Sequence, residues 1–176
     1  MKTYKLGTTG DRILTVKKCG VDHIVTIQVK DDDKKTIELS PKRWATFRQN
    51  IDDITTNAKA VATGDEGIKL WQHIGGAHYV SVTSGYQCVD FRKWFQPYGS
   101  KDGEIKPTKK GVALRFDEWA DLCTLVTTIN TKYPSLGSVL PCYYDDDHMN
   151  QVGWLNCTEC HPFHDNLSQM PTIKMS

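Results

Sequence analysis

The stretch KKTIELSPKRWATFRQNIDDI (Lys34–Ile54) decides the fold, because it has a second copy, KKGVALRFDEWADLCTLVTTI (Lys109–Ile129). The two segments align without a gap at one constant offset, which places Lys34 on Lys109 and Trp44 on Trp119. Each begins with two lysines and a short stretch with a β-branched residue, and each reaches a tryptophan followed by apolar residues three, seven and ten positions later. That spacing is typical of an amphipathic helix, so the sequence predicts a strand followed by a helix, twice.

The starts of both helices carry recognisable signals. Ser40 is suited to the N-cap and Pro41 to the first helical position, whereas Asp117 is an acidic residue suited to a first turn. We therefore expect helices from about residues 41 and 116. Trp44 and Trp119 head the two apolar stripes, so we interpret them as core residues and not as part of a binding site.

Short β-patterned runs precede each helix, and Gly-containing turns join them in pairs. These runs are ILTV (13–16), HIVTIQV (23–29), YVSV (79–82) and CVDFRKWF (88–95). A small sheet with one helix buries too little surface to be stable alone, which favours packing of the two units as a pseudo-twofold pair. The sequence thus predicts an α+β fold of two tandem repeats, each a small antiparallel sheet followed by one helix, packed as an intramolecular pseudo-dimer with a Cys/His-rich C-terminal extension.

The expected boundaries follow the repeats. They are 1–55 for a diverged first repeat, 56–75 for a linker or helix extension, 76–132 for the second repeat and 133–176 for the extension. The copies differ mainly before the helix, where DDDK (31–34) is expected to be a tight turn and QPYGSKDGEIKPTK (96–109) a longer loop.

Composition places the chain among globular proteins, with 39% hydrophobic and 24% charged residues in 176. The formal net charge of +1 neither supports nor excludes a polyanionic partner. We expect no membrane partner and no secretion, since no apolar stretch has the length of a membrane span and no signal segment follows Met1. Six dispersed cysteines favour a reducing compartment over a disulfide scaffold.

The second repeat resembles a known family, the transcriptional positive cofactor four family. The resemblance is carried by HYVSV, VDFRKWF, DGEIKPTKKGVAL and DEW, and its most specific element is the run Lys106–Gly111. Lys34–Trp44 looks like a diverged copy that lacks this run. The resemblance implies a four-stranded antiparallel sheet and a helix that pairs with a second copy, forming two channels for single-stranded DNA. This chain would supply both copies itself, and the two channels would be unequal.

The resemblance also implies an interface on the second repeat. Arg92 and Phe95 match strand positions that face nucleic acid in the family, with Lys106, Lys109 and Lys110 beside them, and Gly111 is expected to let the chain turn into the next strand. The family's basic first hairpin is shortened here, which leaves Tyr86 as the stacking candidate. Trp94 and Phe95 are neighbours on one strand, so only one of them can stack on a base, and the resemblance favours Phe95.

Elementary physics points to the same kind of ligand. Proteins that bind single strands combine a positive groove for phosphates with aromatic rings for bases. The first repeat offers cations without sheet aromatics, so it would hold phosphates but stack poorly; its candidates are Lys17, Lys18, His23, Lys30, Lys34 and Lys35. Taken without the repeat, the lysine pairs have a plainer explanation as solvated hairpins.

The C-terminal extension holds a candidate metal site. Cys157 and Cys160 form a Cys-x-x-Cys pair, and Cys142 with His148 would complete a tetrahedral zinc site, with His161 and His164 as alternative ligands. The alternative is a tail that docks through its aromatic residues with free cysteines. A redox dithiol is disfavoured because no thioredoxin-like pattern surrounds the pair. Apart from this structural zinc, we expect no cofactor.

These features favour a non-enzymatic binder of single-stranded DNA or RNA, largely sequence-independent, acting in transcription, replication or repair. Transcription or replication proteins are further expected partners, a nuclear or viral setting fits the family, and the chain would be a monomeric pseudo-dimer or a homodimer. The first alternative is an adaptor whose Cys/His-rich tail recruits a partner protein. The second is a metal-dependent nuclease using Asp145–His148, which consecutive acidic residues disfavour because they cannot all face one site.

Overall fold

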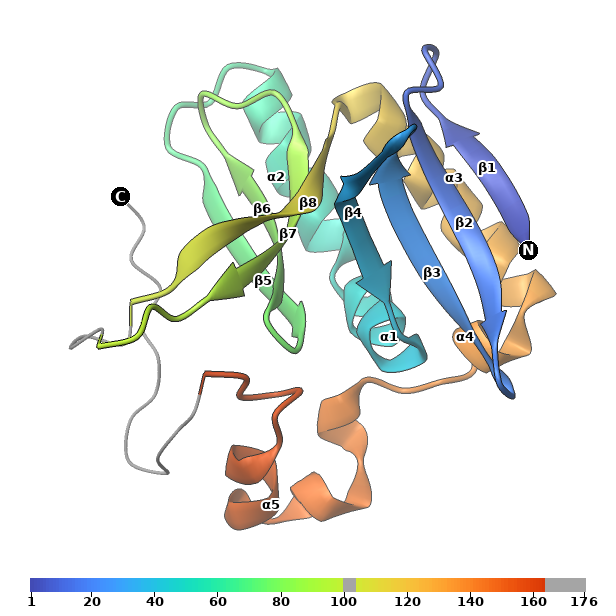
Figure 1. Ribbon diagram of the computed structural model, residues 1–176. Helices are drawn as coiled ribbons and strands as arrows, with labels where there is room; N and C mark the ends of the chain where they lie inside the picture. Colours follow the sequence, from blue (N-terminus) through green and yellow to red (C-terminus); the bar gives the residue numbers. More distant parts are fainter. Residues whose placement is uncertain (100–103, 164–176) are drawn as a thin grey trace.

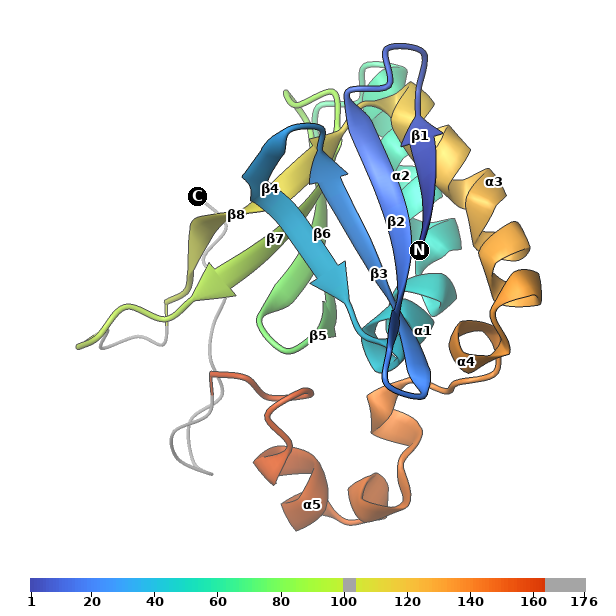
Figure 2. The same ribbon diagram turned by 45° about the vertical axis from the view of Figure 1, so that its right-hand side comes forward.

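The computed structural model describes residues 1–99 and 104–163. Two four-stranded antiparallel sheets lie side by side, and the long helices lie behind both of them (Figure 1). The turned view shows the same layering, with the helices on one side of the sheets and the opposite sheet faces free of helices (Figure 2). A C-terminal lobe, defined here as residues 141–163, lies beyond one end of this core.

The first sheet has strand order β1-β2-β3-β4 and is followed by two helices. Its elements are β1 (Lys2–Leu6), β2 (Arg12–Cys19), β3 (Asp22–Val29), β4 (Asp32–Leu39), α1 (Pro41–Gln49) and α2 (Ile51–Ala62). Val16 pairs with Val25 and Leu14 with Ile27, and all four are buried toward the helices. The alternation of buried and polar residues along β2 and β3 is what gives this sheet one covered face.

The second sheet repeats this plan with order β5-β6-β7-β8. Its elements are β5 (Lys69–Gly75), β6 (His78–Thr83), β7 (Val89–Phe95), β8 (Lys106–Leu114), α3 (Phe116–Lys132) and the short α4 (Pro134–Gly137). The C-terminal lobe then contains η1 (Cys142–Tyr144), η2 (Asp146–Met149) and α5 (Gln151–Asn156). The fold class predicted from the sequence is confirmed.

Both predicted helix starts are confirmed, although their caps differ. The Ser40 hydroxyl accepts the backbone N–H of Arg43 at 3.3 Å, as expected of an N-cap. At α3 the N-cap is Arg115, and the backbone N–H of Arg115 donates to Glu118 Oε2 at 3.0 Å. The carboxylate at the third helical position therefore replaces a conventional hydroxyl cap.

A pseudo-twofold relation joins the two repeats in a shared core. Trp44 Nε1 donates to Asn130 Oδ1 at 2.8 Å, and Trp119 Nε1 donates to Thr55 Oγ1 at 3.2 Å. The offset that relates the two tryptophans also relates their two acceptors. Each repeat thus inserts its tryptophan into the other, which explains why neither sheet needs a core of its own.

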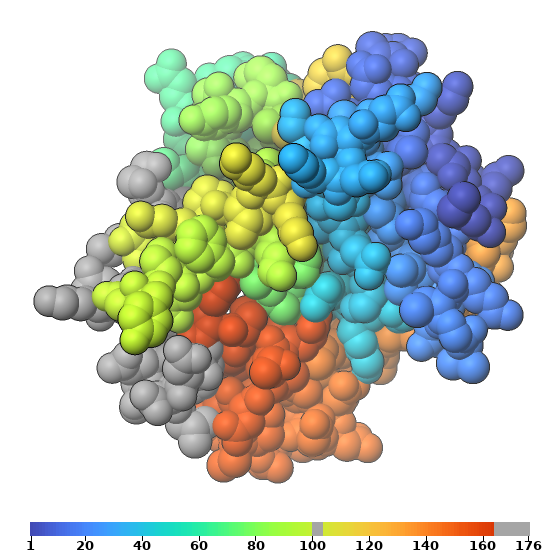
Figure 3. Space-filling view, viewed as in Figure 1, coloured from blue at the N-terminus to red at the C-terminus, as the bar shows by residue number. Residues whose placement is uncertain are grey.

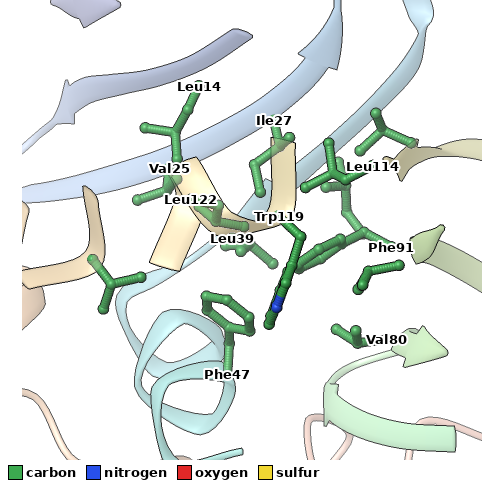
Figure 4. Packing of buried hydrophobic residues seen from close by; sticks show 14 of the residues in the cluster. Leu14, Val25, Ile27, Leu39, Phe47, Val80, Phe91, Leu114, Trp119 and Leu122 are labelled. Atoms are coloured by element: carbon green, nitrogen blue, oxygen red, sulfur yellow. The ribbon is translucent and has the colours of Figure 1, made fainter. Parts of the chain in front are cut away.

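Aromatic rings fill the centre of this core between the sheets and the helices (Figure 4). Phe47 contacts both Phe91 and Trp119 edge-on, with ring centroids 5.4 and 5.9 Å apart. Phe91 belongs to the second sheet and Phe47 to the first helix, so these contacts cross between the repeats. The predicted packing of the Trp44 and Trp119 faces as a pseudo-dimer is confirmed.

Two strands are missing from the sequence prediction. β1 is the outer strand of the first sheet, and β5 is the outer strand of the second. Since β5 spans Lys69–Gly75 and α2 reaches Ala62, the connection between the repeats is 63–68, and the first part of the expected segment 56–75 extends the helix. The second sheet begins at Lys69, not at residue 76.

The lysine-rich run is a strand and not a loop. β8 begins at Lys106, so Lys106, Lys109 and Lys110 all lie on it. Gly111 is inside β8 opposite Arg92, and a Cβ there would lie 2.6 Å from the Phe91 carbonyl oxygen. The expectation that Gly111 forms a turn is wrong: it lets two strands approach closely. Among the described residues, no helix is long and apolar enough to cross a membrane.

Candidate nucleic-acid interface

The sheet faces away from the helices are the candidate binding surface. Figure 3 shows this side of the molecule, with the first repeat in blue beside the second in green and yellow and the C-terminal lobe in orange and red. β4 and β8 are in contact along the seam where the two sheets meet. Because each lysine pair lies on one of these two seam strands, the repeat brings the two lysine pairs toward one another.

The seam holds a cationic cavity that both repeats line. Its volume is about 400 Å³, and its basic residues are Arg12, Lys34, Lys35, Arg92 and Lys109. Lys34 and Lys109 occupy equivalent positions in the two repeats. The acidic residue in the lining is Asp32, whose Oδ2 lies 3.8 Å from Lys35 Nζ. Lys34 and Lys35 of the first repeat therefore share one cavity with Lys109 of the second.

β8 extends this positive surface away from the seam toward the projecting β7–β8 hairpin (Figure 1). Lys106, Lys109 and Lys110 are exposed, and none forms an ion pair with another described residue. Five strand residues span roughly 13 Å from Lys106 to Lys110. Their ammonium groups can donate to phosphate oxygens along that length.

Arg92 is more constrained than the sequence prediction implied. Its guanidinium binds both Asp90 carboxylate oxygens at 3.0 Å and donates to the Thr108 carbonyl at 2.8 Å. Only 25% of its side chain is exposed. Arg92 thus ties β7 to β8 and lines the cavity, but a carboxylate already offsets its charge.

Exposed aromatic rings lie on the projecting hairpin. Phe95 ends β7 and is 45% exposed, and Tyr98 in the following loop is fully exposed. Phe95 pairs with Lys106 across the hairpin, which puts a ring beside a cation. Tyr98 was not among the sequence candidates, although the PYG turn marks its position as a loop. Tyr86 is 68% exposed but precedes the other end of β7, roughly 20 Å of strand away.

A second aromatic group lies on the outer face of the second sheet and is mostly buried. Trp94 contacts Trp71 with ring centroids 4.2 Å apart, and Tyr79 lies 6.3 Å from Trp94. Trp94 is 9% exposed and Tyr79 6% exposed, because Ile105 and Phe163 pack on them. Burial raises the pKa of Tyr79 to about 12. This group stiffens the sheet. Phe95 points to the opposite side of β7 from Trp94, so its exposed ring is reached at the projecting end of the hairpin and not across the outer face.

The outer face of the first repeat carries threonines and a lysine instead of rings. Thr15 and Thr26 pair at its centre, but each is only 5% exposed, and Thr15 Oγ1 lies 3.2 Å from Thr3 Oγ1, so these hydroxyls are not open to a ligand. Lys17, which pairs with Ile24, is exposed and can contact a phosphate, and the face gives no stacking platform. Lys30 is exposed in the β3–β4 turn.

Two first-repeat candidates lie on the other side of the sheet. His23 pairs with Lys18 across the β2–β3 ladder, one position out of phase with Lys17. His23 Nδ1 lies 2.8 Å from Ser135 Oγ, and its ring contacts Tyr133 at the end of α3. The histidine therefore faces the helix layer, and we leave His23 and Lys18 out of the interface.

The C-terminal lobe brings together the four residues predicted to bind metal. Cys142 Sγ lies 3.6 Å from Cys157 Sγ and 3.9 Å from His148 Nε2, and Cys160 Sγ lies 3.5 Å from His148 Nε2. All four ligand atoms lie within 4.8 Å of one another. This arrangement could hold a metal ion. His161, an alternative ligand, bonds the Trp154 carbonyl at 2.8 Å, and His164 lies outside the described residues.

The thiols of this cluster differ in their pKa values. Burial raises the pKa of Cys160 to about 11, with the neighbouring Cys157 adding to the effect, and burial likewise raises the pKa of Cys142. Burial also disfavours the Cys157 thiolate, but hydrogen bonds from the Cys160 backbone and from His148 outweigh it, so the pKa of Cys157 is lowered. Cys157 is thus the thiol most ready to become a thiolate.

The acidic run beside the cluster does not form an open catalytic site. Asp145 Oδ1 accepts Lys42 Nζ at 2.5 Å, which ties the lobe to α1. Asp147 Oδ1 lies 2.9 Å from His148 Nδ1, while the Nε2 of that ring faces the cysteines. Asp145, Asp147 and His148 also place ligand atoms within 4.8 Å of one another, but in this group Asp145 is paired with Lys42 and the ring of His148 is shared with the Cys/His cluster.

Comparison with known proteins supports the resemblance for part of the chain. Residues 79–125 match the family described as Transcriptional Coactivator p15 (PC4), a family of single-stranded DNA-binding, non-enzymatic coactivators. The match begins in β6 and ends inside α3, so it includes Arg92, Phe95 and the β8 lysines. No curated protein and no solved structure matches the chain.

Proposed function

We propose that this chain binds single-stranded DNA or RNA through the β7–β8 hairpin and the seam between its two sheets. The strand would pass from Phe95 and Tyr98, along the lysines of β8, into the cavity at the seam. There it would meet Lys34 and Lys35 of the first repeat. Binding would be largely independent of sequence and would involve no catalysis.

The observation that carries this proposal is the position of the β8 lysines. They connect exposed rings at one end with a cavity lined by cations from both repeats at the other. Stacking on a ring requires an unpaired base, whereas phosphate contacts require only charge. A surface with both favours single strands over duplexes. The family match over residues 79–125 supports the same ligand.

A fluorescence anisotropy titration tests the proposal. The full chain is titrated against a labelled single strand and against the duplex of the same sequence, over a series of salt concentrations. We expect tighter binding of the single strand and a linear fall of log affinity with log salt. Equal affinity for strand and duplex at moderate salt would contradict the proposal.

A matched pair of double variants locates the surface. Lys109→Ala with Lys110→Ala removes two β8 cations, and we expect the salt slope to fall by about 1.4, because each phosphate contact on a single strand contributes about 0.7. Lys59→Ala with Lys132→Ala removes the same charge from α2 and α3 in the helix layer. An equal fall of the salt slope in both double variants would mean that binding depends only on the net charge of the chain and not on the β8 surface.

We further propose that the protein acts in transcription, replication or repair, in a nuclear or other reducing compartment, with proteins of those processes as partners. The support is the coactivator family that residues 79–125 match. Co-purification of nucleic acid and proteins from cells, with nuclease treatment to separate direct from bridged partners, tests this. Proteins that still co-purify after nuclease treatment, and that also co-purify with the Lys109 and Lys110 double variant, would be direct protein partners.

For the C-terminal lobe we propose metal binding through Cys142, His148, Cys157 and Cys160. A second candidate role of this lobe is partner recruitment, since Met149 and Val152 are 84% and 62% exposed. Substituting Met149 and Val152 by serine should abolish recruitment without changing nucleic-acid affinity. Unchanged recruitment of partners by that variant would remove the adaptor role.

A further inference from the structure

The C-terminal lobe has little means of holding its own shape. Its three helical segments, η1, η2 and α5, contain no buried hydrophobic residue. Segments this short and this exposed do not fold by burial alone, and small lobes of this kind depend on a cross-link or a metal. The Cys/His cluster is the feature of the lobe that can supply one.

The spacing of the ligand atoms fits a tetrahedral zinc ion. With Zn–S bonds of about 2.3 Å and Zn–N bonds of about 2.0 Å, two sulfurs would lie about 3.8 Å apart and a sulfur and a nitrogen about 3.5 Å apart. The Cys142–Cys157 separation is 3.6 Å, and the sulfur–nitrogen separations are 3.5 and 3.9 Å. A disulfide would need about 2.0 Å between sulfurs.

The surroundings of His148 fit a zinc ligand as well. Its side chain is 2% exposed, with Nε2 facing the cysteines and Nδ1 2.9 Å from an Asp147 carboxylate oxygen. A carboxylate hydrogen-bonded to the far nitrogen of a ligating histidine fixes the ring and its tautomer; here Asp147 is close enough for that role, but its present contact with Nδ1 lacks the geometry of a hydrogen bond. Three thiols and one imidazole form a soft donor set, which favours zinc over calcium or magnesium.

The Cys-x-x-Cys segment also reaches the core of the fold. Glu159, between the two cysteines, binds Arg43 of α1 through both carboxylate oxygens, at 2.5 and 3.1 Å. The Glu159 carbonyl accepts the backbone N–H of Gly76 in the β5–β6 turn at 2.7 Å. We call this contact between α1, the turn and Glu159 the β5–β6 corner.

The pseudo-twofold relation shows why this corner needs the lobe. At the equivalent corner of the first repeat, the turn after β1 meets the start of α3, and Gly7 N–H donates to Asp121 Oδ2 at 2.7 Å. There Glu118 is fully buried and binds Arg115 at 2.7 Å. Arg43 of the first repeat aligns with Glu118 of the second. One corner has its own carboxylates, and the other receives Glu159 from the lobe.

We propose that Cys142, His148, Cys157 and Cys160 bind one structural zinc ion, which holds Glu159 in place as the missing carboxylate of the β5–β6 corner. The inference rests on metal binding by the lobe and is independent of nucleic-acid binding. The zinc has no catalytic role here. It closes the segment from Cys142 to Cys160 and fixes its Cys-x-x-Cys turn against α1 and β5.

Elemental analysis and thiol counting on the purified full chain test the site. We expect about one zinc ion per chain, and loss of zinc from Cys142→Ser and from Cys160→Ser. Cys19→Ser and Cys88→Ser are the matched controls, because both cysteines lie outside the cluster and should leave the zinc content unchanged. Cobalt substitution should give the strong visible absorption of tetrahedral thiolate coordination. Stoichiometric iron, no metal, or a disulfide between Cys142 and Cys157 would overturn the site.

Hydrogen exchange tests the corner without requiring a variant to fold. After removal of zinc from the wild-type chain with a chelator, the Gly76 amide should exchange at least about tenfold faster, because its acceptor is no longer held. The Gly7 amide, whose acceptor lies on α3, is the internal control and should not change. Glu159→Gln should keep its zinc and its backbone carbonyl but lose the ion pair with Arg43, and because that pair helps to hold residue 159 against α1, its Gly76 amide should exchange faster than in the wild type.

Unchanged exchange at Gly76 after zinc removal would overturn the role of the corner and leave the metal site standing. Both readouts are made without nucleic acid. A failure to bind single strands would therefore contradict the proposed function without affecting this inference.

Discussion

At the scale of single residues, the two indole N–H groups determine how the repeats recognise each other. Trp44 and Trp119 each donate to an acceptor in the other repeat, and the acceptors Asn130 and Thr55 are also related by the repeat. A buried indole without an acceptor costs more than its bond contributes when made. Hydrogen bonding therefore makes the pairing of the repeats specific, in addition to the apolar core.

Removing one acceptor should reveal this specificity. In Asn130→Ala, the Trp44 indole N–H loses its acceptor. Trp44 is fully buried, so water does not reach the N–H easily. We expect the free energy of unfolding to fall by about 1–3 kcal/mol. Denaturant titration measures it, with Asn57→Ala as the control, because the Asn57 amide bonds the Asp53 carbonyl of its own helix. A loss no larger than that of the control would show that water replaces the bond.

Acid should weaken the fold through His78. Burial lowers the pKa of His78 from 6.5 to about 4, and Arg43 adds to the effect. The folded state thus resists protonation that the unfolded state accepts below pH 6.5. The stability that neutral His78 contributes is complete above pH 6.5 and is lost as the pH falls toward 4.

The measurement is the free energy of unfolding between pH 7 and 4 for the wild type and for His78→Gln. We expect the variant to lose less stability over this range, since it has no imidazole to protonate. Both proteins carry the same Cys/His cluster, so acid release of a bound metal cancels in the difference. If the free energy of unfolding changed with pH in the same way for both proteins, His78 would already be solvated in the folded state.

At the scale of elements, the helix starts could be predicted, but the division of the first helical stretch into α1 and α2 and the two edge strands could not. Helical spacing in Trp44–Ile54 and Trp119–Ile129 carries its own signal, which is why both helix starts were correct. β1 and β5 are sheet edges, where KTYKL and KLWQHIG mix charge and apolar residues in patterns too short to stand out. Their place was determined by pairing with β2 and β6, which a local pattern does not contain.

Features of the candidate site likewise divide into those that the sequence predicts and those that depend on tertiary contacts. Strand alternation predicted that Trp94 and Phe95 face opposite sides, but only the contacts with Trp71 and Tyr79 show which ring is covered. Spacing predicted the four Cys/His residues that come together in the lobe. The ion pair between Glu159 and Arg43 joins residues 116 positions apart, so it depends on the docking of the lobe and has no sequence signal.

The β7–β8 hairpin should separate stacking from stability. Phe95→Ala with Tyr98→Ala removes two exposed rings, so we expect unchanged unfolding and a loss of single-strand affinity of about 1–3 kcal/mol per stacked base. Trp94→Ala is the contrasting variant, because that ring is 9% exposed and its loss should cost about 3 kcal/mol of stability. Anisotropy and denaturant titration give the two quantities. Unchanged affinity in the double variant would place stacking elsewhere.

At the scale of the whole molecule, duplication has placed the two lysine pairs at one seam. Two copies of a binding unit within one chain could work as two separate channels, but β4 and β8 lie together and their lysines line a shared cavity. A cavity with cations from both repeats can hold one backbone more strongly than either repeat alone. On the proposed path the absence of the Lys-Pro run from the first repeat is tolerable, since both halves would act on the same strand.

A shared seam predicts one short single strand per chain. Titration at concentrations well above the dissociation constant should show an equivalence point of one oligonucleotide per chain, and Lys34→Glu should weaken that same binding event as much as Lys109→Glu does. Both charge reversals face the one cavity, so each repels the same phosphates. Lys59→Glu, in the helix layer, should have a much smaller effect that high salt removes. Two equivalents per chain, with Lys34→Glu affecting only one of them, would instead establish two independent channels.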